Sequence, residues 1–345
     1  MARRFRPRSS PWHVDDSEFY ELQTFEEEVR FLLRFAVLAP SGHNTQPWSF
    51  RVTPDGVEVY ADYTRRLAII DPADRELLMS VGAAIANLRV AAAHFGFDTS
   101  VLYETRPEES LPVALITVRE TCAPEGGLSH LFRAIKERHT NRRRFTNQPI
   151  EPQAMAAVRT FLSTHHDVVE LITAPQEKQY IAHLIEKGDY IQMGDPGFRK
   201  ELAAWIRPNA AGDPDGIPGD ALAGVPDALS NAAPWVVEHV NPAAIQARQD
   251  RKSAENAPAL IIIKADDDRV HLLQAGEVLE LLLLTLTLHG VQYAFMNQAI
   301  EVETLRGRLA SMLTTDEPPQ LLLRVGYAPP VSRPAPRCSL ESVLT

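Results

Sequence analysis

The sequence predicts an α+β fold built from two similar halves in one chain of 345 residues. Long helical stretches mix with short strand-like runs in an irregular order, which favours α+β over a regular array of βαβ units. The order of helix, strand, long helix and strand occurs in residues 21–126 and again in residues 127–345. A turn-rich insertion, residues 194–235, interrupts the second half, and residues 1–20 are predicted to be an N-terminal tail.

The first half begins with an amphipathic helix at residues 25–38. Phe31 and Phe35 lie on one side of it, and three glutamates occupy its first turn. Alternating side chains on both sides of Pro54 predict a β-hairpin. The strands expected in this half are residues 48–52, 57–60, 101–103 and 113–118. A long helix is expected at residues 73–95, where several small residues would let a second helix approach closely.

The second half contains the same types of element. Its expected helices are residues 128–137, 152–163, 176–193, 272–289 and 301–313. Its expected strands are residues 168–172, 259–264, 292–295 and 320–325. The insertion at residues 194–235 contains six glycines and six prolines. Long turn-rich insertions in compact domains are usually lids, binding loops or disordered segments, and we interpret this one as a lid.

The overall composition is that of an ordinary globular protein, with 45% hydrophobic and 23% charged residues. The net charge of −10 argues against nucleic acid or an anionic membrane as partner. Cys122 and Cys338 are too few for a disulfide framework, and they fit a cytoplasmic setting. The most apolar run, residues 278–288, is shorter than the roughly 20 residues that span a bilayer, so we predict a buried helix. Arg3 and Arg4 could belong to a twin-arginine signal, but no apolar stretch follows them, which favours a flexible basic tail.

The segment APSGHNTQPWSF, residues 39–50, has the features of a ligand-binding turn. A helix ends at Pro40, a tight turn follows at Ser41, and amide side chains stand at Asn44 and Gln46. Amides both donate and accept hydrogen bonds, which suits the edge of a planar polar ligand. A turn that only caps the preceding helix would have the same composition, so both interpretations stay open.

The segment RHTNRRRF, residues 138–145, is strongly basic in an acidic protein. Arg138, Thr140 and Arg142 could converge on a phosphate, because arginine offers forked donors and threonine adds a hydroxyl. A solvated basic face is the alternative. Contact with nucleic acid is a third possibility, and it lacks interleaved aromatic residues and a wider basic surface.

Other motifs are weaker. The sequence has no Gly-x-Gly-x-x-Gly and no Walker loop, so nothing supports a Rossmann or P-loop nucleotide site. His165, His166 and Asp167 lack companion ligands at helical spacing, which favours a surface turn over a metal site. We therefore predict no metal, and no residue is assigned as a catalytic acid or base.

Together, the two segments resemble the FMN-dependent nitroreductase family. In that family a basic segment of the form Arg-His-Ser-x-Lys holds the phosphate and ribityl chain of FMN, and a Pro-Ser-x-x-Asn-x-Gln-Pro-Trp segment from the partner subunit closes the site. The matching positions of this chain are Pro40, Ser41, Asn44, Gln46, Pro47 and Trp48, and then Arg138, His139, Thr140 and Arg142, with Thr for Ser and Arg for Lys. The resemblance also implies that Asn297 and Gln298 lie against the flavin ring. It places Arg333 and Arg337, in the C-terminal tail, near the phosphate.

The two segments stand in an unusual order. In ordinary family members the basic segment comes first, whereas here it follows the Pro-Ser segment. Asp15 and Asp16 occupy the place of the first half's own basic segment, and the second half has no Pro-Ser segment. The chain in this respect resembles the Acg-type nitroreductases. The resemblance implies a fused pseudo-dimer in which one of two sites has decayed, so that one FMN is bound per chain.

The resemblance allows two classes of function. An FMN-dependent oxidoreductase would take electrons from NAD(P)H and reduce a nitroaromatic or quinone-like acceptor, with Arg142 stabilising the reduced flavin. A lid closed over the flavin would instead make the protein an FMN-sequestering or storage protein with little or no turnover. A fused pseudo-dimer could be a monomer or form a homodimer of pseudo-dimers.

Overall fold

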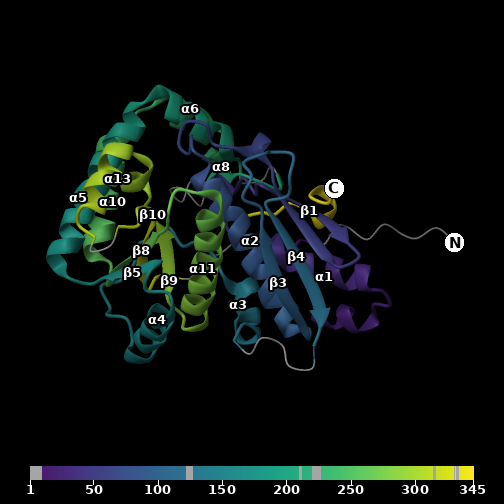
Figure 1. Cartoon of the computed structure of the whole chain (residues 1–345). Helices are drawn as coiled ribbons and strands as arrows, with labels where there is room; N and C mark the ends of the chain where they lie inside the picture. Colours follow the sequence, from purple (N-terminus) through teal and green to yellow (C-terminus); the bar gives the residue numbers. More distant parts are fainter. Residues whose placement is uncertain are drawn as a thin grey trace.

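The computed structural model describes residues 10–121, 127–209, 212–219, 227–313, 316–329, 331 and 334–345. Two four-stranded antiparallel sheets stand on either side of two long central helices, α2 and α11 (Figure 1). The first sheet is formed by the first half of the chain and the second sheet by the second half. This arrangement confirms the predicted α+β class.

The first sheet has the strand order β1-β2-β4-β3. Its strands are β1 (Trp48–Thr53), β2 (Gly56–Ala61), β3 (Phe97–Tyr103) and β4 (Ala114–Glu120). Helix α1 (Phe25–Ala36) precedes the sheet and starts at a capping box, in which Thr24 and Glu27 each bond the other's backbone N–H. Helix α2 (Arg75–His94) connects β2 to β3.

The second sheet has the equivalent order, β5-β8-β10-β9. Its strands are β5 (Val169–Ile172), β8 (Ala259–Lys264), β9 (Gln292–Phe295) and β10 (Pro319–Gly326). Helix α11 (Arg269–Leu288) connects β8 to β9, as α2 connects the second and third strands of the first sheet. Both sheets therefore share one strand order and one position for the long helix. The repeated order of elements is confirmed, and the origin of the chain as a fused pseudo-dimer stays a prediction.

The two central helices cross at a pair of glycines. A Cβ atom at Gly82 would lie 2.0 Å from the Leu273 carbonyl oxygen, and one at Gly276 would lie 2.1 Å from the Met79 carbonyl oxygen. No real Cβ atom makes such contacts, so glycine is required for this close approach. By length and composition alone, both helices are apolar enough to cross a membrane. In the molecule, however, 89% of the apolar stretch of α2 and 61% of that of α11 are buried. The predicted buried helix at residues 278–288 is thus confirmed as part of α11.

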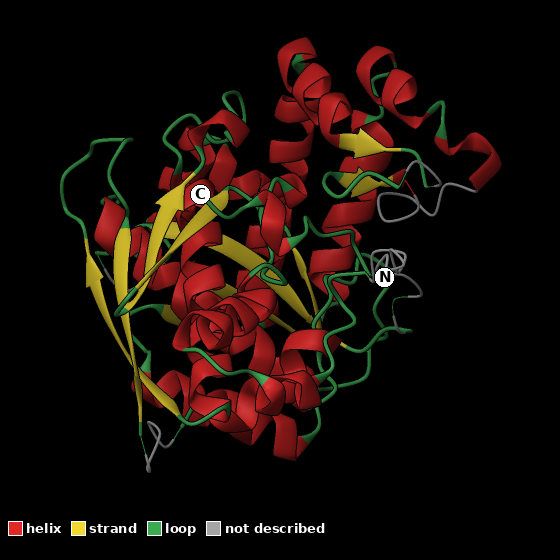
Figure 2. Cartoon of the chain, turned by 90° about the vertical axis from the view of Figure 1, so that its right-hand side faces the viewer, coloured by secondary structure: helices red, strands yellow, loops and turns green. Residues whose placement is uncertain are grey.

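A helical segment separates β5 from β8, and it contains the insertion predicted at residues 194–235. The first sheet has only a two-residue turn at the same place, between its first and second strands. Its elements are α5 (Pro175–Gly194), α6 (Pro196–Trp205), β6 (Ile206–Arg207), β7 (Ile217–Pro218), α8 (Asp227–Ser230), α9 (Ala233–His239) and α10 (Ala243–Asn256). Figure 2 shows the short parallel β6–β7 pair and the helices around it standing apart from the two larger sheets. Residues 194–235 are more helical than their turn-rich composition indicates. Two of their prolines, Pro196 and Pro234, occupy the first turns of helices, where proline is tolerated.

Further helices complete the second half, namely α3 (Phe132–Glu137), α4 (Pro152–Thr164), α12 (Gln298–Glu301) and α13 (Glu303–Ala310).

Both ends of the chain pack against other parts of the molecule. The C-terminal tail returns to the first half, where Phe50 N donates to Val343 O at 2.8 Å and Thr345 N donates to Phe50 O at 2.9 Å. Part of the predicted N-terminal tail is also folded, since Trp12 is buried and donates its indole N–H to Ala335 O at 2.9 Å.

Candidate functional site

A cavity of about 540 Å³ lies where the two halves, the insertion and the C-terminal tail meet. Its walls come from the loop after α1, from the central helices, from the basic segment after α3, from α12 and from the tail. The volume is within the range of small-molecule sites. Most of the residues that the sequence analysis selected line this cavity: Pro40, Ser41, Asn44, Arg138, His139, Thr140, Arg142, Asn297, Gln298 and Arg337.

Arg138 forms a buried ion pair in the cavity wall. Its side chain is 1% exposed, and its Nε atom lies 3.1 Å from Glu280 Oε1. The guanidinium also donates to Leu38 O at 3.0 Å and to the Tyr293 hydroxyl at 2.7 Å. Burial raises the pKa of Glu280 to about 7, although the neighbouring arginines act in the opposite direction. Arg138 is therefore held largely by protein groups, and its main contribution to the cavity is positive charge.

Arg337 brings a second positive charge to the same place. It is 6% exposed, donates to Asn44 Oδ1 at 2.9 Å and to Leu38 O at 3.2 Å, and lies over the Trp12 ring. Its Nε atom is buried without a hydrogen-bond partner among the described residues. Burial and the charge of Arg138 lower the pKa of Arg337 to about 9. An anion in the cavity would relieve this repulsion and supply the missing acceptor.

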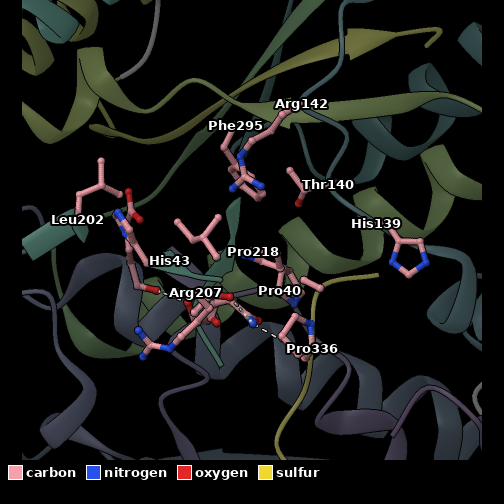
Figure 3. A pocket seen from close by; sticks show the side chains of 18 of the residues that line it. Pro40, His43, His139, Thr140, Arg142, Leu202, Arg207, Pro218, Phe295 and Pro336 are labelled. Carbon is pink, nitrogen blue, oxygen red and sulfur yellow. Dashed lines mark hydrogen bonds between the residues drawn. The ribbon is translucent and has the colours of Figure 1, made fainter. Parts of the chain in front are cut away.

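Arg142 reaches into the cavity beside Thr140 (Figure 3). Within the described parts of the chain, no carboxylate forms an ion pair with its guanidinium, and burial lowers its pKa. Burial and the charge of Arg142 lower the pKa of His43 to about 4, so that this imidazole is neutral at pH 7. Figure 3 shows His139 to one side of these residues, and its ring meets Trp12 edge-on at 4.8 Å. Burial, followed by the charge of Arg138, lowers its pKa to about 4 as well.

The amide side chains of the Pro-Ser segment join three parts of the chain. Asn44 Nδ2 donates to Gly216 O and to Pro336 O, both at 3.0 Å. Gln46 is fully buried; its Nε2 donates to Pro214 O at 2.9 Å, and its Oε1 accepts from Cys338 N at 2.8 Å. These bonds hold the β6–β7 segment and the C-terminal tail against the first half. Gln46 was expected among the FMN-binding residues; in the described structure its amide is engaged by backbone groups and it does not line the cavity, and its contact with FMN stays a prediction.

Another part of the cavity wall carries paired carboxyl groups. Glu76, in the first turn of α2, hydrogen-bonds to Glu301 at the end of α12. Asn297 Nδ2 donates to Glu76 Oε1 at 2.8 Å, and Gln192 Nε2 donates to Glu301 Oε2 at 2.5 Å. Burial raises the pKa of Glu76 well above its usual range, and burial raises that of Glu301 to about 7. The pair therefore retains a proton at neutral pH.

The remaining predicted residues are placed as follows. Gln298 Nε2 donates to Asp189 at 3.2 Å and to Asp250 at 3.1 Å, whereas its Oε1 is buried without a partner in the described structure. Arg333 and Cys122 lie outside the described residues. The sequence analysis did not select Glu76 or Glu301, because nothing in the local pattern of either segment marks a carboxylate that faces a cavity.

No family model matches the chain. The chain is 29% identical over 316 residues to "Putative NAD(P)H nitroreductase Rv3131" of Mycobacterium tuberculosis, covering 90% of this chain and 88% of that protein. It is 27% identical over 313 residues to "Putative NAD(P)H nitroreductase acg" of the same organism, covering 89% and 91%. A "putative nitroreductase" structure from Anabaena variabilis aligns with 95% of this chain and 93% of its own, at 11% identity and a TM-score of 0.48. The sequence relatives confirm the resemblance to Acg-type nitroreductases that the two motif segments indicate.

Proposed function

We propose that this protein is an FMN-binding oxidoreductase of the nitroreductase type and that it holds one FMN in the cavity between its halves. The observation that carries the proposal is the positive charge at one part of the cavity. Arg138 and Arg337 both donate to the Leu38 carbonyl oxygen, and Arg138 is paired with Glu280. Arg142 adds a third guanidinium to the cavity. The phosphate of FMN would neutralise this cluster.

The residues of the cavity fit FMN in three respects. Arg337 Nε is a buried donor without an acceptor in the described structure, and Thr140 supplies a hydroxyl in the lining of the same cavity. Met79, Ala83 and Leu279 of the central helices offer an apolar wall for a ring system. Bound FMN would supply hydride and electron transfer, which no side chain can provide. The protein would position the cofactor and set the charge around it.

Arg142 is the residue that we assign to the electrostatics of the reaction. Its guanidinium faces the cavity without a carboxylate partner in the described structure. A cation without a carboxylate partner beside the cofactor favours the anionic form of the reduced cofactor. NAD(P)H is the proposed reductant, and a nitroaromatic or quinone-like molecule is the proposed acceptor.

A second candidate function, FMN sequestration, is favoured by the contacts of the insertion. The backbone of residues 214–216 accepts hydrogen bonds from Asn44 and Gln46. Asp215 accepts from Arg65 at 3.1 Å and from Arg207 at 3.0 Å. These bonds hold the segment in the cavity wall, where it would act as a closed lid. A lid that stayed closed would hold FMN and keep a nicotinamide out.

Anaerobic reduction separates the two functions. The purified full-length protein is loaded with FMN, freed of excess cofactor and mixed with NADPH in the absence of oxygen. For an oxidoreductase we expect the yellow flavin absorbance to bleach within seconds. Persistent yellow colour that bleaches only with a small chemical reductant would identify the sequestering function. A protein that retains no FMN would refute both.

A further inference from the structure

The Glu76–Glu301 pair lies at the meeting of three elements in the cavity wall. Glu76 comes from α2, Glu301 from α12 and the Gln192 amide from α5, and all three line the cavity. Residues 76 and 301 come from different halves of the chain, so folding alone brings them together. Glu76 is 9% exposed. Two carboxylates this close inside a protein cannot both be ionised without a large Coulomb cost, so they share a proton.

The surroundings favour the protonated form of the pair. Asp71 adds negative charge that acts on both glutamates. The positive charge of Arg75 acts in the opposite direction and lowers the pKa of both glutamates. Its guanidinium donates to Gln320 Oε1 at 2.8 Å. Hydrogen bonds from the N–H groups of Asn297 and Gln192 favour the carboxylate form and only partly offset the effect of burial. No lysine, arginine or histidine forms an ion pair with either glutamate in the described parts of the chain. The pair thus keeps a transferable proton beside the cavity.

We propose that the Glu76–Glu301 pair donates the proton that an electron acceptor needs when it is reduced in this cavity, and that both glutamates are therefore catalytic residues. The inference rests on the proposed oxidoreductase function. It also defines the acceptor class: molecules whose oxygen atoms must gain a proton as they gain electrons, such as quinones and nitroaromatic compounds. Acceptors that take an electron without a proton should not depend on the pair.

The step balances for a quinone. Bound, reduced FMN would supply a hydride, which carries two electrons and one proton. The carboxyl pair gives one further proton to the carbonyl oxygen of the acceptor, and the product is the hydroquinone. The pair is left with one additional negative charge, and it regains its proton from water after the product leaves. General acids of this kind contribute about 100-fold or more to a rate, and they act best with a pKa near the working pH.

Three variants test the proposal. Glu301→Gln and Glu76→Gln keep the shape of the side chain and most of its hydrogen bonds but remove the carboxyl proton. Glu303→Gln is the matched control, because Glu303 is two residues from Glu301 and its side chain is 85% exposed. Each FMN-loaded protein is reduced with light, so that NADPH plays no part. It is then mixed anaerobically with 1,4-benzoquinone or with ferricyanide, and flavin reoxidation is followed by stopped flow.

We expect Glu301→Gln to slow reoxidation by benzoquinone about 100-fold and to leave reoxidation by ferricyanide within about twofold of the wild type. The wild-type rate with benzoquinone should fall as the pH rises through about 7, because Glu301 then ionises and only the more firmly held proton of Glu76 remains, whereas the rate for Glu301→Gln should not change with pH. Glu76→Gln should act in the same direction, and Glu303→Gln should match the wild type. Equal slowing with both acceptors would show that the pair only shapes the site and would overturn the proposal.

Carboxyl titration provides a readout that does not depend on turnover. In protein labelled with ¹³C at glutamate side chains, NMR should show a carboxyl that titrates near neutral pH in addition to Glu280 and that is missing in Glu301→Gln. A spectrum in which Glu301→Gln removes no signal that titrates near neutral pH would refute the shared proton. Failure of the wild-type protein to retain FMN would overturn the proposed function itself and is visible before any mixing experiment.

Discussion

Replacing Gly276 with alanine should force the two central helices apart. The new Cβ atom would lie 2.1 Å from Met79 O and 2.7 Å from Met79 Cα. Ordinary van der Waals contact begins at 3.4 Å, so the helices must move by about 1.3 Å (3.4 minus 2.1). The obstacle is helix backbone, which cannot rotate away as a flexible side chain would.

The size of the effect follows from two opposing contributions. Overpacking a tight core costs about 1–3 kcal/mol, and we expect the upper end because both contacts are with backbone. Alanine recovers about 1 kcal/mol through its better helix propensity. The free energy of unfolding should therefore fall by about 2 kcal/mol. FMN binding should weaken as well, because Met79 and Leu279 of the two helices line the cavity.

Urea denaturation followed by tryptophan fluorescence measures this change. Gly307→Ala is the matched control, since Gly307 lies in α13 and a Cβ atom there would have nothing within 4 Å. The control should be stabilised by about 0.5–1 kcal/mol. A Gly276→Ala protein as stable as the wild type would refute the close helix crossing.

The other predictions concern charge. Arg142→Ala should raise the FMN dissociation constant about 10- to 100-fold, because a hydrogen bond to a charged group contributes about 1.5–3 kcal/mol; the exposed Arg144→Ala should leave it unchanged, and a fluorescence titration compares them. Asp215→Asn should weaken the lid and raise NADPH oxidation by about two- to fivefold; an unchanged rate would exclude Asp215 from holding the lid. Burial and the charge of Asp250 raise the pKa of Asp189 to about 8 from 3.8. The native state then binds a proton that the unfolded chain has released, so stability should fall as pH rises between these values. Asp189→Asn should flatten that slope in denaturation at several pH values.

Local patterns determine most of the secondary structure. Helix α1 follows from the spacing of Phe31 and Phe35, and β10 follows from an apolar run that is buried on both faces. Helix α10 was not predicted. Its buried residues are the alanines Ala243, Ala247 and Ala254, and small residues give no periodic signal of large apolar side chains. It packs closely against α5 for the same reason, because alanine allows short distances between helices.

The sequence predicted one part of the candidate site and not the other. The motif segments at residues 39–50 and 138–145 are visible in the sequence, and both lie at the cavity. The sequence did not show which contacts each residue of these segments makes. Gln46 hydrogen-bonds the insertion and the tail, and Arg138 is paired with Glu280, a residue far along the chain that has no motif of its own.

The sequence by itself therefore determined the α+β class, the order of the elements in both halves and the presence of a basic segment and an amide-rich turn. Only the tertiary structure decided which charges meet. Arg138 and Arg337 share the carbonyl of Leu38, and Glu76 lies against Glu301. Periodicity and turn chemistry act over a few residues, whereas pKa values and charge pairing depend on groups that come together only when the two halves pack around the central helices.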